Sequence, residues 1–175
     1  FFINSLAHIW GTQPYTNENT ARDNGILALL TYGEGYHNFH HCYAADYRNG
    51  VRWWQWDPTK WLIFSLSKIG LAHNLRRIPD VRIQHARLEH QFRILEEKLA
   101  RRERLLPKIR LTHIPERITV EYENLRTAFD QWRKAHEQRQ EGRRDELRRV
   151  TRETLARMRE LRRRLRFIDA EIATA

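Results

Sequence analysis

The chain has 175 residues, a formal net charge of +10 and one cysteine. This length allows one modest domain, or a small domain with an extended tail, and the lone Cys42 excludes an internal disulfide. No basic leader followed by an apolar stretch and a small-residue cleavage site is visible, so we expect no signal peptide. The chain starts at Phe1 rather than at a methionine, which predicts a piece of a longer protein.

The composition changes near Pro79. Residues 1–79 contain 7 basic and 5 acidic side chains, whereas residues 80–175 contain 25 and 17. Five of the six tryptophans fall within residues 1–61. These differences predict two domains, residues 1–79 and residues 80–175, and the periodicity of both favours an all-α fold.

Helical patterns follow one another in the first region. Residues 1–11 read as the end of an apolar helix that is stopped by Gly11. Thr20 is a candidate N-cap for a second apolar helix, which reaches Tyr32. The glycines of residues 33–35 interrupt this pattern, and a third helix is expected directly after them.

Tryptophan is concentrated before a fourth helix, which the amphipathic pattern predicts over Thr59–Ala72. Aromatic rings beside Arg52 and Lys60 are typical of the boundary between lipid headgroups and acyl chains. An ordinary buried helix with aromatic packing is the alternative. No run reaches the ~20 apolar residues that span a bilayer, so the spanning helices of a membrane parent are expected mostly before Phe1.

The second region carries narrow apolar stripes with helical spacing. They predict three helices that pack as hairpins or coiled coils. We expect one break near residues 107–116, with Pro107 and Pro115, and another near residues 140–144, with Gly142. The stripes comprise Leu88, Phe92, Leu95 and Leu99; Ile118, Tyr122, Leu125, Phe129 and Trp132; and Leu155, Met158, Leu161, Leu165, Ile168 and Ile172.

The clearest chemical motif is His-Asn-Phe-His-His at residues 37–41. Helical positions i, i+3 and i+4 fall within an arc of about 100°. The spacing therefore predicts that His37, His40 and His41 point into one volume, where neutral imidazoles bind iron, zinc, copper or nickel. Five other histidines are scattered and are expected on the solvated surface: His73, His85, His90, His113 and His136.

Asn4 and His8 are four residues apart and share one face of the first helix. A histidine in an apolar helix near a membrane is unfavourable unless it has a partner. Both a satisfied core histidine and a metal ligand fit this pair.

The motifs together resemble the stearoyl-CoA desaturase family, over about residues 1–79. The Gly-Glu-Gly-aromatic-His-Asn-aromatic-His-His string is highly specific, and the bacterial acyl-CoA members look most similar. We therefore expect the C-terminal part of a membrane-bound fatty acid desaturase, with the end of a transmembrane helix, cytosolic cap helices and a coiled-coil-like tail. The matching segments are residues 1–11, 13–15, 33–41, 46–48 and 52–61.

The resemblance implies ligands for two iron ions. In that family three histidine boxes and one further histidine hold the irons without bridging carboxylates, and this chain matches the third box. By resemblance, His8 is the further histidine, and Asn4 reaches a metal through water. His37, His40 and His41 are the box ligands. Glu34 and Asp46 are candidates for orienting the imidazoles, with capping or surface roles as the alternative.

The implied reaction removes two hydrogens from a saturated fatty acyl chain and forms a cis double bond at the delta-9 position. It consumes O2 and two electrons, the cofactor is two Fe2+ ions, and no catalytic residues beyond the metal ligands are implied. The implied substrate is a fatty acyl-CoA or acyl-lipid, and the electron donor is a b-type cytochrome, a ferredoxin or a similar protein. The full-length parent is implied to be a multi-pass membrane protein, with this segment mainly on the cytoplasmic face.

Two other classes stay open. One is another histidine-box membrane oxygenase, such as a hydroxylase. The other is a non-enzymatic basic coiled-coil or nucleic-acid-binding protein, which a pI near 10.3 permits. Acidic residues interleaved with the basic ones favour ion pairing over phosphate binding, so no nucleic-acid partner is expected. The arginines of residues 162–166 fit either anionic lipid headgroups or a solvated helix face.

Overall fold

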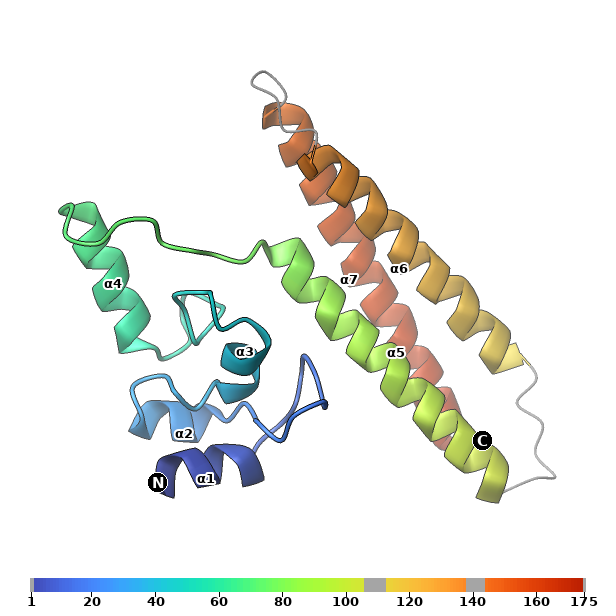
Figure 1. Cartoon of the computed structure of the whole chain (residues 1–175). Helices are drawn as coiled ribbons and strands as arrows, with labels where there is room; N and C mark the ends of the chain where they lie inside the picture. Colours follow the sequence, from blue (N-terminus) through green and yellow to red (C-terminus); the bar gives the residue numbers. More distant parts are fainter. Residues whose placement is uncertain (1, 106–112, 138–143, 175) are drawn as a thin grey trace. The chain divides into compact units, whose positions relative to one another are not determined.

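The computed structural model describes residues 2–105, 113–137 and 144–174, and these parts of the chain form α-helices without strands (Figure 1). The prediction of an all-α fold is confirmed. The chain divides into two compact units, Phe1–Pro79 and Asp80–Ala175. Within the described residues, no helix has both the length and the apolar character needed to cross a membrane. The helices are α1 (Phe2–Ile9), α2 (Gly25–Leu30), α3 (His37–Cys42), α4 (Pro58–Lys68), α5 (Asp80–Leu105), α6 (His113–Glu137) and α7 (Arg144–Thr174).

The start of α2 differs from the prediction. Asn24 is the N-cap, because its Oδ1 accepts hydrogen bonds from the amides of Ile26 and Leu27 at 2.9 and 3.1 Å. The predicted cap, Thr20, lies outside the helix and forms a hydrogen bond with His8 instead. Asparagine is as good an N-cap as threonine, so the local rule selected the wrong one of two suitable residues.

A buried lysine holds the loop that precedes α4. Lys60 Nζ donates to three backbone carbonyls, those of Gly50, Arg52 and Gln55, at 2.9, 2.9 and 3.1 Å. Asp57 caps α4 by accepting the amide of Lys60, and it also accepts the amides of Asn49 and Gly50. Burial lowers the pKa of Lys60, an effect that nearby Asp57 opposes. The loop therefore wraps around one ammonium group and is fixed at both ends.

Replacing Lys60 with methionine should destabilise the first unit by about 2–4 kcal/mol, because three carbonyls lose a charged donor. Tryptophan fluorescence during urea unfolding follows this unit, since five of the six tryptophans lie within residues 1–61. Lys68→Met is the matched control, because Lys68 is exposed and its ammonium lies over the Phe64 ring. Equal unfolding midpoints for the two variants would contradict the proposed role of Lys60.

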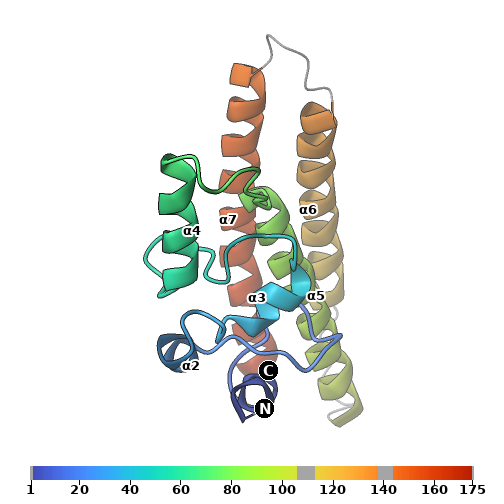
Figure 2. The same ribbon diagram turned by 60° about the vertical axis from the view of Figure 1, so that its left-hand side comes forward.

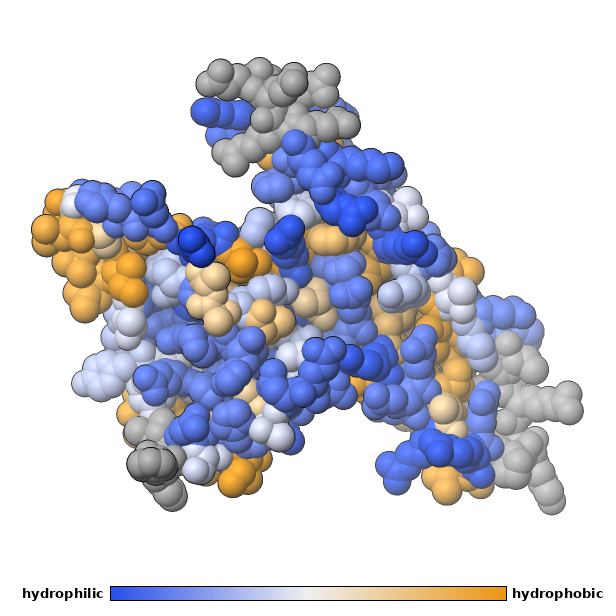
Figure 3. All heavy atoms as spheres, in the orientation of Figure 1, coloured by the Kyte–Doolittle hydropathy of each residue, from blue (hydrophilic) through white to orange (hydrophobic). Residues whose placement is uncertain are grey.

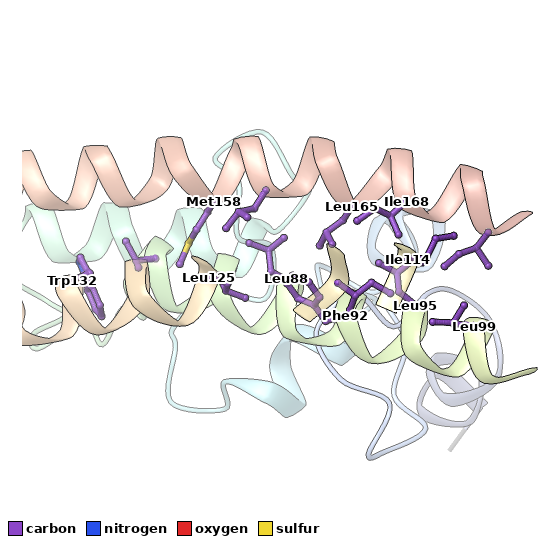
Figure 4. Packing of buried hydrophobic residues seen from close by; sticks show 14 residues of the cluster. Leu88, Phe92, Leu95, Leu99, Ile114, Leu125, Trp132, Met158, Leu165 and Ile168 are labelled. Carbon is purple, nitrogen blue, oxygen red and sulfur yellow. The ribbon is translucent and has the colours of Figure 1, made fainter. Parts of the chain in front are cut away.

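The second unit is a three-helix bundle in which α5, α6 and α7 lie side by side, with α6 antiparallel to the other two (Figures 1 and 2). The predicted stripes supply most of the apolar core (Figure 4). Tyr122 is an exception, because it is 40% exposed and contacts the Phe92 ring from the edge. The buried core comprises Val81, Leu88, Phe92, Leu95, Leu99, Ile114, Ile118, Leu125, Trp132, Met158, Leu161, Leu165, Ile168 and Ile172.

Of the three residues predicted to break helices, one lies within the described residues. Pro115 was expected in the first break, but it lies in the first turn of α6. A proline is tolerated there because the first amides of a helix have no partner within the helix. Pro107 and Gly142, the other predicted breakers, lie outside the described residues.

Three of the scattered histidines are buried or half-buried, contrary to the prediction of a solvated surface. His90 is 4% exposed and lies 3.1 Å from an Arg93 nitrogen. His85 stacks on Phe129, and His136 stacks on Trp132. For His85 and His136 the aromatic neighbour explains the difference, because an imidazole ring packs well on an aromatic face. His73 and His113 are exposed, as expected.

Ion pairs join the helices of the second unit. Lys98 of α5 pairs with Asp169 of α7 at 2.5 Å, and Arg164 of α7 pairs with Glu121 of α6 at 3.0 Å. Arg163, also in the predicted basic run, pairs with Glu160. Part of the basic run is therefore occupied by the acidic residues interleaved with it, although each exposed pair contributes little to stability.

Candidate metal centre

Three histidines from two helices converge in the first unit. His8 lies on α1, and His37 and His41 lie on α3. His37 Nε2 is 3.2 Å from His8 Nε2 and 3.1 Å from His41 Nε2. One nitrogen from each residue lies within 4.8 Å of the others, so the group offers a possible metal site.

The spacing of these nitrogens fits a metal ion. For a metal–nitrogen bond of about 2.1 Å, two imidazoles bound next to each other on one ion place their nitrogens about 3.0–3.4 Å apart. The two distances at His37 agree with this value. A donor set of imidazoles alone suits iron, zinc, copper or nickel. Burial raises the pKa of the nearby Cys42 thiol, which disfavours the thiolate form that binds metals.

The charge state of the cluster also suits metal binding. The pKa of His37 is lowered to about 4, first by burial and then by the neighbouring histidines His41, His8 and His40. The pKa of His41 is lowered by burial as well. Neutral imidazoles keep a lone pair available as a ligand, so these two residues are ready to bind a metal at neutral pH.

His40 lies outside this three-nitrogen group, and the convergence of all three box histidines into one volume stays a prediction. Its ring centroid lies 6.1 Å from that of His37 and 6.0 Å from that of His41, and its side chain is exposed. At about 100° per residue, His40 and His41 lie on opposite sides of His37. His8 approaches on the side of His41. Asn4 lies one turn before His8 and is exposed, and its role through water stays a prediction.

The two residues between the box histidines anchor α3. Asn38 is fully buried and uses its whole side-chain amide. Its Oδ1 accepts the amide of Tyr15, and its Nδ2 donates to the carbonyls of Thr16 and Ala21. Phe39 is 1% exposed and packs against the Tyr15 ring. The buried face of this short helix therefore turns the histidines outward.

Asp23 connects the segments that carry the histidines. Its Oδ1 accepts the amides of Asn38 and Phe39 at 2.9 and 3.1 Å, in the first turn of α3. Its backbone pairs with Thr12, just after α1, through hydrogen bonds of 3.0 and 2.6 Å. A carboxylate is favourable at a helix N-terminus, where amides lack partners. The residue thereby sets the position of His37 relative to His8.

Two glycines allow the close approach of these segments. Gly11 has φ +133°, and a Cβ there would lie 2.6 Å from the Asp23 carbonyl oxygen. A Cβ at Gly35 would lie 2.1 Å from the Ala28 amide nitrogen, within α2. A larger residue at Gly11 would push the end of α1 away from Asp23, and one at Gly35 would push the start of α3 away from α2.

Thr20 orients His8, a role that sequence analysis missed. His8 Nδ1 lies 2.8 Å from Thr20 Oγ1. When Nδ1 donates its proton to this hydroxyl, the Nε2 lone pair faces the other two histidines. The twelve-residue separation leaves no local signal for the contact.

The two acids expected to orient the imidazoles are placed differently. Asp46 is buried and binds Arg48 through both carboxylate oxygens, and it also accepts the amide of Ile78. It thereby fastens the end of the first unit. Glu34 is exposed, and its amide donates to the Thr31 carbonyl. The contacts of the Asp46 carboxylate are structural, and a role of either acid in orienting the imidazoles stays a prediction.

No model of a protein family matches this chain. It is 46% identical over 101 residues to acyl-CoA desaturase 1 of Saccharomyces cerevisiae, a match that covers 58% of this chain and 20% of that protein. A probable acyl-CoA desaturase of Schizosaccharomyces pombe is 48% identical over 96 residues, covering 55% and 20%. The sn-2 palmitoyl-lipid 9-desaturase of a Nostoc species is 36% identical over 85 residues, covering 49% and 30%.

These relatives come from both fungi and a cyanobacterium, and the expected bacterial type is not confirmed. The chain spans about a fifth of the length of the two fungal relatives. About half of this chain is therefore similar to one segment of acyl-CoA and lipid desaturases.

Proposed function

We propose that this chain is the C-terminal part of an acyl-CoA delta-9 desaturase and supplies ligands to its di-iron centre. The observation that carries the proposal is the convergence of His8, His37 and His41 Nε2 atoms, in a stretch similar to named desaturases. His40 lies on the other side of His37 and would serve the second iron. Asn4 would reach the centre through water.

The residues of this chain would hold the centre rather than exchange protons with the substrate. Bound iron supplies the activation of O2 that breaks unactivated C–H bonds. The Thr20 hydroxyl would accept a hydrogen bond from protonated Nδ1 of His8, which leaves the Nε2 lone pair as the ligand. Asp23 and Asn38 fix α3, and the depressed pKa of His37 keeps its lone pair free at neutral pH.

The substrate and partners follow from the same proposal. The chain that is desaturated would be a saturated fatty acyl-CoA or an acyl-lipid. O2 and two electrons from a b-type cytochrome, a ferredoxin or a similar protein would complete the reaction. The parent would be a multi-pass membrane protein with this segment on the cytoplasmic face. The bundle of residues 80–175 would be a packing appendage, because among its described residues no group of histidines, cysteines and acids is arranged as a metal site.

Product analysis in a desaturase-deficient yeast tests the proposal. The full-length protein that contains this chain should restore growth without added unsaturated fatty acids. Cis-monounsaturated chains should appear in the extracted lipids, and their chemical derivatives should place the double bond at the ninth carbon. A double bond at another position would refute the delta-9 assignment alone. Hydroxylated chains would assign the protein to the other class of histidine-box oxygenase.

A further inference from the structure

Many exposed apolar side chains gather around α4. We call them the tryptophan surface: Trp53, Trp54, Trp56, Trp61, Leu62, Phe64, Ile69 and Leu71. Trp53 is 82% exposed and Ile69 is 70% exposed. The aliphatic part of this surface is visible as orange spheres over α4 in Figure 3. Large exposed apolar patches on a folded unit usually mark an interaction site.

The helix turns its apolar side away from the unit. At about 100° per residue, the exposed positions of α4 and its C-cap occupy an arc of roughly 220°. Four of these seven positions are apolar, namely Trp61, Leu62, Phe64 and Ile69. The buried residue of the helix is Lys60. This arrangement is the reverse of an ordinary surface helix, whose apolar stripe faces the core.

The exposure of the tryptophans is built into the loop. Lys60 Nζ draws the carbonyls of Gly50, Arg52 and Gln55 inward, and the side chains of Trp53 and Trp54 stay outside. Trp61 Nε1 donates to the Trp53 carbonyl at 3.2 Å, which ties the loop to the helix. An ordinary buried helix, the alternative from the sequence, is therefore not what the structure shows.

The charges around this surface have one sign. Residues 49–79 contain five basic side chains and one acid, Asp57, which is fully buried. The guanidinium of Arg52 lies 5.4 Å from the Trp54 ring centroid, and the ammonium of Lys68 lies 4.9 Å from that of Phe64. Within residues 49–79, the exposed side chains therefore include aromatic rings, aliphatic groups and cations but no carboxylate.

We propose that the tryptophan surface lies in the headgroup region of an anionic lipid bilayer. Tryptophan rings prefer that region, and basic side chains beside them are attracted to anionic headgroups. A helix with an apolar face can bury that face at the boundary of the acyl chains without spanning the membrane. A second copy of the chain is a poorer occupant, because it would bring Arg52 and Lys68 against further cations.

This contact goes beyond the proposed chemistry and does not require bound iron. The 175-residue chain, purified with a chelator, is mixed with vesicles of phosphatidylcholine and phosphatidylserine or of phosphatidylcholine alone, and bound protein is sedimented. It should bind the anionic vesicles more strongly, and added salt should weaken the binding. Tryptophan emission should shift to shorter wavelength and be quenched by lipids brominated near the headgroup.

Trp53→Ser combined with Trp54→Ser should lower the partition coefficient at least about tenfold, because two exposed rings no longer leave water. Val120→Ser combined with Phe167→Ser removes exposed apolar residues from the second unit and should bind like the wild type. Arg52→Gln combined with Lys68→Gln should remove most of the preference for anionic lipid. Equal binding by the wild type and the tryptophan variant would overturn the proposal. The proposal would also be overturned if the wild-type chain did not bind vesicles and instead formed a dimer that the tryptophan variant disrupts.

Discussion

Replacing His37 with alanine should lower desaturation at least about 100-fold, because loss of a mere supporting partner of a ligand already costs about 10–100-fold. His37 Nε2 lies next to the nitrogens of both His8 and His41, so its removal separates the remaining two donors. Its depressed pKa also makes it a neutral ligand at neutral pH. The measurement is the cis-monounsaturated product per unit of protein, made by the full-length parent from a saturated acyl-CoA, O2 and reductant.

His73→Ala is the control, because His73 is exposed and distant in sequence from the cluster. It should keep wild-type activity at the same membrane level. His41→Ala should resemble His37→Ala, since both residues contribute an Nε2 to the cluster. Near-wild-type turnover by His37→Ala at matched protein levels would remove His37 from the site.

The box helix was predictable from the sequence because its pattern is local. Histidines at i, i+3 and i+4 share a helix face, and the apolar stripes of α5 to α7 repeat within one element. The structure has these helices, and most stripe residues are buried. The same local rule does not say which histidines share one group of nitrogens, because His40 and His41 lie on either side of His37 within an arc of about 100°.

The contacts that assemble the cluster were not predictable, because they join residues far apart in the chain. Thr20 contacts His8, and the Asn38 amide bonds with residues 17 to 23 positions away. Thr20 and Asp23 each fit a local role, as an N-cap or a loop residue. Only the folded structure shows that the Thr20 hydroxyl contacts a histidine of α1 and that the Asp23 carboxylate accepts amides of α3.

The direction in which the apolar side of α4 faces was also not predictable from the sequence. The sequence has an amphipathic pattern, but the pattern does not state which side faces the protein. Lys60 decides this, because three carbonyls around its ammonium replace the water that a buried charge would lose. A lysine one turn before Phe64 in this helix would ordinarily be assigned to solvent.

Asp23→Ala should destabilise the first unit by about 2–4 kcal/mol, because two amides at the start of α3 lose their acceptor. A helix of six residues is unstable alone, so its position depends on such contacts. Urea unfolding followed by tryptophan fluorescence measures the loss in the 175-residue chain. Asp23→Asn retains one acceptor oxygen and should recover most of the stability, whereas Glu34→Ala removes an exposed acid and should change little. If Asp23→Ala unfolded at the same urea concentration as Glu34→Ala, the Asp23 carboxylate would not hold the histidine-bearing helix in place.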